Sequence, residues 1–212
     1  MRSDFVFDDG GMNLLSSAAL RRIGEALPRD AATSLFVFRS GRSGLFAAGA
    51  DMAEMQRFTA WEAWSFAELG QELFARIERL PSVTVALIDG DCFGGALDLV
   101  LAFDLRFATP RSRFAHPGAR LGIVTGFGGT SRWRSVISRR AANQLFLANR
   151  VLGASEALGL GLVDRVAESH EEELARLESL DLTMVKKLTR HAQRPECARV
   201  ESKLALPHSK LQ

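Results

Sequence analysis

The feature that most restricts the fold is a strand signal that runs directly into a glycine turn and an apolar helix. The run VTVALI (Val83–Ile88) has the composition of a strand, and DGDCFGGALDLVLAF follows it. A further short strand is expected at Leu105–Ala108. Strands that alternate with helices in this way indicate an α/β fold, in which helices pack against a sheet.

The rest of the chain continues this alternation. Apolar residues recur at spacings of three and four over residues 60–80, which predicts an amphipathic helix with one buried stripe. Within it, Trp61, Trp64 and Phe66 are interpreted as core or interface packing, with ligand stacking as the alternative. The other expected elements are helices at 15–26 (capped by Ser16 or Ser17), 130–147 and 154–160, and strands at 34–38 and 162–166.

A chain of 212 residues is long enough for one domain with a sizeable core and short for two. We expect a core at residues 1–168. A short C-terminal helical segment at 169–212 is expected to serve as an oligomerisation element or lid, with a polar end that frays after Pro207.

Charge, cysteines and hydropathy exclude several classes of protein. The formal net charge of +2 provides no global field for nucleic acid. Cys92 and Cys197 form no CxxC pair, and the four histidines are scattered singly, so we expect no metal site. The N-terminus lacks a signal-peptide core, and the longest apolar run is too short to cross a bilayer. The expected location is therefore the cytoplasm.

Three glycine-rich segments could carry chemistry. They are LFAAGADMAEM (Leu45–Met55), DGDCFGGALD (Asp89–Asp98) and RFAHPGARLGIVTGFGGTSRW (Arg113–Trp133). Small residues after a strand let a ligand approach the backbone, whose amides can donate to an oxyanion, and a helix N-terminus adds further donors. Each segment alone is also compatible with a purely structural turn, and neither GxGxxG nor GxxxxGK[ST] is present.

Taken together and in this order, the segments resemble the enoyl-CoA hydratase/isomerase (crotonase) family. FAAGADMAEM is similar to the family's F-x-A-G-A-D-x-x-E-M loop, and ALIDGDCFGGALDL to its A-x-x-x-G-x-x-x-G-G-x-x-(acid)-L segment. FAHPGARLGIVTGFGGT resembles F-x-x-P-E-x-x-x-G-x-x-x-x-x-G-G-T, and ASEALGLGLV resembles A-x-E-A-x-x-x-G-L-V. The resemblance covers roughly residues 13–166.

This resemblance implies a spiral of ββα turns with C-terminal helices, here shortened at both ends, and assembly as a homotrimer or hexamer. It places an oxyanion hole for a thioester at the backbone amides of Ala50 and Gly95. The substrate is then an acyl-CoA, and no metal or redox cofactor is needed. The residues implied to line the coenzyme A site are Ala47, Ala48, Gly49, Asp51, Met52 and Gly94.

The acid/base positions depart from the family pattern. The two glutamates that clamp a water in the family's hydratases correspond to Asp98, a shorter carboxylate, and to Gly118, which has no side chain. Asp98 is interpreted as the proton shuttle, with a helix-dipole role as the alternative. His116 is a candidate replacement for the lost carboxylate, with a structural role as the alternative.

The specific reaction stays open at the level of sequence. Isomerisation or hydration of an enoyl-CoA by one carboxylate is the leading hypothesis. The alternatives are a family member that has lost its chemistry and serves as an acyl-CoA-binding or scaffold protein, and a decarboxylase or thioesterase that uses the same oxyanion hole. Dehalogenation is disfavoured, because the position that resembles the nucleophilic aspartate is Gly126.

Overall fold

The computed structural model describes residues 1–186 apart from 30–31, 123–124, 181 and 185. Its centre is a five-stranded sheet in the order β1-β3-β6-β8-β11, and all four pairings are parallel. The strands span Arg2–Phe7 (β1), Leu35–Ser40 (β3), Val83–Ile88 (β6), Leu105–Ala108 (β8) and Arg165–Val166 (β11).

A second sheet has the order β10-β9-β7-β4. Its strands are Leu45–Ala47 (β4), Asp91–Phe93 (β7), Arg113–Ala115 (β9) and Leu152–Gly153 (β10). Three consecutive turns of chain each place one strand in the first sheet and the next in the second: β3 then β4, β6 then β7, and β8 then β9. The fold is thus an α/β spiral, as the family resemblance implies.

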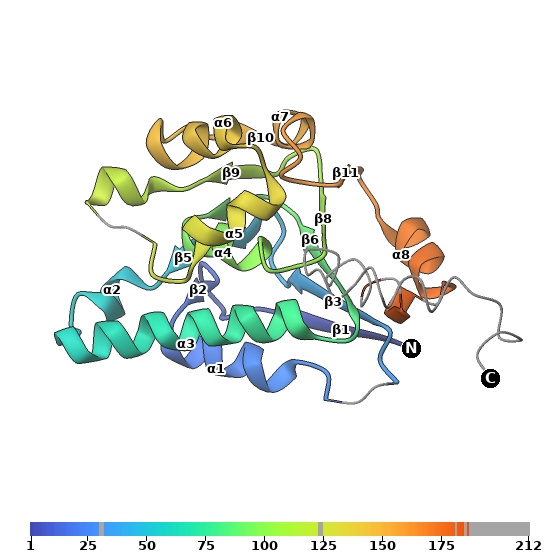
Figure 1. Ribbon diagram of the computed structural model, residues 1–212, viewed down its shortest axis with the longest axis horizontal. Helices are drawn as coiled ribbons and strands as arrows, with labels where there is room; N and C mark the ends of the chain where they lie inside the picture. Colours follow the sequence, from blue (N-terminus) through green and yellow to red (C-terminus); the bar gives the residue numbers. More distant parts are fainter. Residues whose placement is uncertain (30–31, 123–124, 181, 185, 187–212) are drawn as a thin grey trace, which may run out of the picture.

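Helices cover the spiral from several sides (Figure 1). Helices α1 (Ser17–Ala26) and α3 (Ala60–Arg79) run side by side below the first sheet. The other described helices are α2 (Met52–Met55), α4 (Gly95–Val100), η1 (Pro117–Leu121), α5 (Gly129–Val136), α6 (Arg139–Ala142), η2 (Asn143–Leu147), α7 (Ala154–Gly159) and α8 (Glu171–Glu178). A two-residue strand, β2 (Leu14–Leu15), pairs with β5 (Gly49–Ala50).

Local sequence signals explain where the long helices begin. The Thr59 hydroxyl accepts from the Glu62 amide while the Glu62 carboxylate accepts from the Thr59 amide, a capping box that starts α3. Ser16 caps α1. This helix begins two residues later than predicted, because Leu14 and Leu15 are extended in β2.

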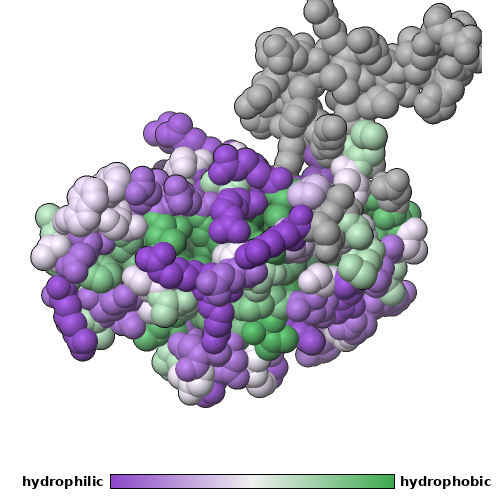
Figure 2. Space-filling view, turned by 90° about the horizontal axis from the view of Figure 1, so that it is seen from below, coloured by the Kyte–Doolittle hydropathy of each residue, from purple (hydrophilic) through white to green (hydrophobic). Residues whose placement is uncertain are grey.

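The core is built on phenylalanines from the sheets and from α3. Phe38 on β3 packs against Phe46 and Phe103, with ring centroids 5.7 Å apart in both pairs. A smaller cluster joins the opposite face of β3, β6 and β8 to Leu174 and Leu177 of α8. Seen from below (Figure 2), the surface mixes hydrophilic side chains with smaller apolar areas, as expected where helices turn a polar face to solvent.

Several predicted elements require correction. Of the two kinds of packing predicted for Trp61 and Trp64, core packing is wrong: they are 70% and 52% exposed and stack on each other with centroids 4.9 Å apart. Packing at an interface stays a prediction. Phe66 alone of the three is buried. The helix predicted at 130–147 is divided, because Ile137 is extended and Ser138 caps a new helix.

The predicted strand at 162–166 is reduced to its last two residues. Residues 187–212, including the predicted fraying after Pro207, lie outside the described residues. Over the part of the chain that is described, none of the helices has the length and apolar character needed to cross a membrane.

Candidate active site

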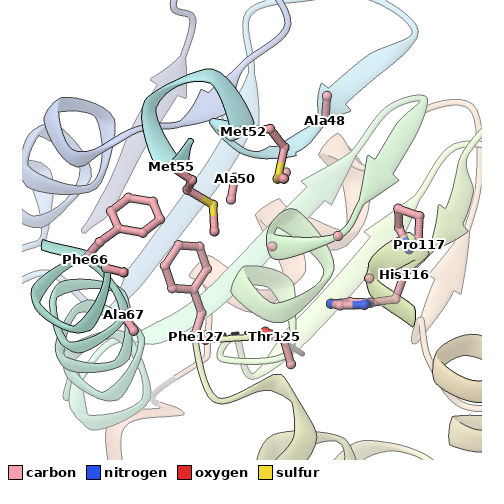
Figure 3. Close-up of a pocket in the computed structure, with 16 residues that line it drawn as sticks. Ala48, Ala50, Met52, Met55, Phe66, Ala67, His116, Pro117, Thr125 and Phe127 are labelled. Atoms are coloured by element: carbon pink, nitrogen blue, oxygen red, sulfur yellow. Dashed lines mark hydrogen bonds between the residues drawn. The ribbon is translucent and has the colours of Figure 1, made fainter. Parts of the chain in front are cut away.

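The three glycine-rich segments meet α3 around a single pocket of about 290 Å³ (Figure 3). One end is formed by backbone from β5 and α4 together with His116, and the other by apolar side chains from α2 and α3. The lining residues are Ala48, Gly49, Ala50, Met52, Met55, Ala63, Phe66, Ala67, Gly94, Gly95, His116, Pro117, Gly118, Thr125, Gly126 and Phe127.

The amides of Ala50 and Gly95 lie next to each other at this pocket. A Cβ built on Gly95 would be 3.3 Å from the Ala50 nitrogen, and one built on Gly49 would be 3.2 Å from the Gly95 nitrogen. Gly49 has φ +105°, and a side chain there would also meet the Phe93 carbonyl oxygen at 2.8 Å. Only glycine at position 49 allows β5 to approach α4 so closely.

Neighbouring hydrogen bonds indicate where the two N–H groups point. The Asp51 amide donates to the Leu15 carbonyl in the parallel β2–β5 pair, so the Ala50 amide, one residue earlier, points to the other side. Gly95 is the first residue of α4, where the amides have no partner within the helix. The Gly94 amide before it is already bonded to the Ala115 carbonyl. The Ala50 amide thus points away from β2, and the Gly95 amide has no partner within α4.

Asp98 lies in the first turn of α4 and is completely buried. Its Oδ2 accepts a short hydrogen bond from the Thr125 hydroxyl. Its Oδ1 has no hydrogen-bond partner among the described residues but lies 3.5 Å from Nε2 of His116. Gly129 passes so close that a Cβ there would be 1.7 Å from Oδ1. Asp98 does not line the pocket itself.

His116 stands between Asp98 and the pocket. It follows β9, is 5% exposed and packs its ring on Phe146 with centroids 4.8 Å apart. Its Nε2 is buried and, within the described part of the chain, makes no hydrogen bond. The two unpartnered polar atoms of Asp98 and His116 thus face each other.

Burial, with the nearby charges of Asp98 and Asp91, raises the pKa of the Cys92 thiol, so this buried cysteine stays neutral.

Only some of the residues predicted to bind coenzyme A line the pocket. Ala48, Gly49, Met52 and Gly94 line the pocket, whereas Ala47 and Asp51 do not. Ala47 is fully buried in β4. The Asp51 carboxylate caps α2 by accepting from the amides of Ala53 and Glu54, each at 3.0 Å.

Sequence reasoning did not single out Met55, Ala63, Ala67, Thr125 and Phe127, and it gave Phe66 a ligand-stacking role only as the alternative to packing. Thr125 and Phe127 lie within the third glycine-rich segment, where a hydroxyl and a ring between glycines are the signal that could have found them. The described residues contain no cluster of three or more His, Cys, Asp or Glu side chains that could hold a metal ion.

Comparison with known proteins connects this geometry to a family. Residues 12–202 match the family described as enoyl-CoA hydratase/isomerase. The chain is 36% identical over 163 residues to a crotonyl-CoA hydratase from Syntrophomonas wolfei, covering 76% of this chain and 63% of that protein. It is 34% identical to a short-chain-enoyl-CoA hydratase from Clostridium acetobutylicum, covering 76% and 62%. The chain thus spans less than two thirds of the length of these relatives.

The fold is also similar to solved structures. A crystal structure of an enoyl-CoA hydratase from Bacillus anthracis superimposes with a TM-score of 0.87 at 23% identity. The similarity covers 95% of this chain and 84% of that one.

Proposed function

The chain belongs to the enoyl-CoA hydratase/isomerase family, and on this premise we propose that it is an enzyme that binds an acyl-CoA thioester and stabilises its enolate. The single observation that carries this proposal is the pair of adjacent amides, Ala50 and Gly95, at one end of an otherwise apolar pocket. The relatives' names, crotonyl-CoA hydratase and short-chain-enoyl-CoA hydratase, support an enoyl thioester as substrate.

The two amides act as an oxyanion hole. When a proton leaves the carbon next to the thioester carbonyl, negative charge moves onto the carbonyl oxygen. Fixed N–H donors from Ala50 and Gly95 stabilise that charge without reorganising, and one such donor typically contributes about 3–4 kcal/mol to the transition state. The flanking residues Ala48, Gly49, Met52 and Gly94 contact the coenzyme A portion. Neither a metal ion nor a redox cofactor is needed for this step.

Asp98 and His116 handle the proton as a pair. His116 is the member that lines the pocket, and Asp98 lies behind it with Oδ1 facing Nε2. A carboxylate in this position orients the imidazole. Thr125 fixes the other carboxylate oxygen. His116 is therefore the group that takes and returns the proton, and Asp98 acts on the substrate only through His116.

The pair favours isomerisation over hydration. Moving a double bond requires one group that takes and returns a proton, whereas adding water in the two-carboxylate manner requires a second acid/base at Gly118, which has no side chain. Losing one such group typically costs about 10²–10⁴ in rate.

The missing side chain at Gly118 also favours a second candidate function, that of a family member that binds acyl-CoA without turning it over. By analogy with the family, we propose that the chain assembles as a homotrimer or hexamer.

Proton exchange separates these candidates without knowledge of the natural substrate. In deuterated water, an enolate-forming enzyme exchanges the α-protons of butyryl-CoA, which NMR detects. We expect exchange by the native protein and a loss of about 10²-fold or more in Asp98→Asn and His116→Gln. Binding of butyryl-CoA with no exchange would identify a binding protein, and absence of binding would refute the acyl-CoA site. Light scattering on the same sample tests the assembly.

A further inference from the structure

The ring of Phe127 separates the pocket from the hydrophobic core. Phe127 lines the pocket yet is only 3% exposed. Its ring meets Phe74 edge-on with centroids 5.5 Å apart and lies against Gly70, and neither of these α3 residues lines the pocket. In Figure 3 the ring stands between Phe66 and Ala67 of α3 and the Ala50 side of the pocket. Phe127 is thus a partition, with the pocket on one side and the core under α3 on the other.

Two glycines make the slot that this ring fills. A Cβ on Gly70 would be 2.2 Å from Cδ1 of Phe127, and a Cβ on Gly95 would be 3.0 Å from Cε2. Real Cβ contacts are essentially never shorter than 3.0 Å, so a side chain at position 70 would displace the ring. Because α3 and α4 each present a glycine, Phe127 can lie beside the backbone that carries the Gly95 amide.

We propose that Phe127 closes the acyl end of the pocket and restricts the substrate to short acyl groups. The inference rests on the proposed function, because it assumes a thioester oxygen at the amides of Ala50 and Gly95. From there, an acyl chain that runs toward the apolar residues of α3 meets the Phe127 ring. The walls of this short passage are Met55, Ala63, Phe66 and Ala67.

Two substitutions should shift chain-length preference in opposite directions. Phe127→Ala removes the partition and opens the pocket toward Gly70 and Phe74. Gly70→Ala replaces no residue that lines the pocket, but its Cβ forces the Phe127 ring away from α3 and toward the acyl passage. Each methylene that gains burial strengthens binding about fourfold, which corresponds to about 0.8 kcal/mol.

The measurement compares two saturated ligands, butyryl-CoA and octanoyl-CoA, by calorimetry with the full chain. The native protein should bind butyryl-CoA the more tightly of the two. Phe127→Ala and the milder Phe127→Leu should raise the ratio of octanoyl to butyryl affinity, by about tenfold or more for Ala. Gly70→Ala should lower the ratio. Phe74→Leu is the matched control, because it loosens the same core without touching the pocket, and its ratio should equal that of the native protein.

The outcomes distinguish this inference from the function on which it rests. If the native protein binds neither thioester, the proposed function fails and the inference fails with it. If the native protein binds butyryl-CoA but both Phe127 variants keep the native ratio, Phe127 does not set the acyl length and only the inference is overturned. An equal shift in Phe74→Leu also overturns it, because general loosening would then explain the effect.

Discussion

Adding one methyl group at Gly129 should disable the candidate site without touching the pocket. In Gly129→Ala, the new Cβ would be 1.7 Å from Oδ1, 2.5 Å from Cγ and 3.2 Å from Oδ2 of Asp98. Since such contacts are not made below 3.0 Å, the carboxylate must retreat by more than an ångström from its place beside His116. Asp98 is fully buried and held by Thr125, so no open space receives it.

This displacement should lower both the folding free energy and the rate of proton transfer. Overpacking of a buried site typically costs about 1–3 kcal/mol of folding free energy. In a domain of this size, that loss lowers the melting temperature by several degrees. A misplacement of about 1 Å in a proton-transfer pair costs about 10²-fold in rate. Affinity for butyryl-CoA should change little, because neither Gly129 nor Asp98 lines the pocket.

The assays are thermal unfolding followed by circular dichroism, α-proton exchange of butyryl-CoA and calorimetric binding. Gly159→Ala is the matched control: it makes the same chemical change at a helical glycine with nothing within 4 Å of the added atom. It should melt and exchange like the native protein. If the Gly129→Ala protein melts and exchanges like this control, the missing side chain at Gly129 does not fix the position of the Asp98 carboxylate.

Three further predictions concern stability, each measured by reversible unfolding. Asn13→Ala should destabilise the fold by about 2–4 kcal/mol, since its buried amide donates to the carbonyls of Phe7 and Phe46, which would lose their donor; a loss below about 0.5 kcal/mol would contradict this. Burial lowers the pKa of His170, so the unfolded chain takes up a proton more readily, and stability should fall as the pH drops below the ordinary histidine value of about 6.5. His170→Gln should flatten that fall, and an unchanged pH profile would exclude His170 as its source. Thr59→Ala should cost about 1 kcal/mol through loss of the α3 cap, and no change would mean that the capping box contributes nothing.

Periodic elements of this fold could be predicted from the sequence, because one residue pattern determined each of them. The strand at Val83–Ile88 and the helix over 60–80 depend on apolar spacing within a single segment, and the structure confirms both. The predicted helix at 130–147 is divided because Ser138 caps a new helix. The spacing of apolar residues does not reveal such a cap. The exposure of Trp61 and Trp64 could have been predicted from the same spacing, because neither lies three or four residues from a member of the buried stripe that begins at Phe66.

The candidate site, too, could be predicted from the sequence only in part. The segments that carry Ala50, Gly95 and Asp98 could be found from their glycines and from family resemblance, whereas the relation between Asp98 and His116 depends on how α4 packs against β9 and on the missing side chain at Gly129. A contact between two distant segments cannot be predicted from the local sequence of either segment.

The glycines of this site perform two different physical tasks, and this distinction explains why a glycine-rich pattern alone says little about chemistry. Gly49 is needed for its backbone conformation, which brings the Ala50 amide beside that of Gly95. Gly70 and Gly129 are needed for the volume they leave empty: one makes room for the Phe127 ring and the other for the Asp98 carboxylate. Substituting the first kind should move the two amides proposed as oxyanion donors, and substituting the second kind should move a side chain that is distant in sequence. Acyl length and proton transfer would therefore depend on Gly70 and Gly129 as well as on the side chains that line the pocket.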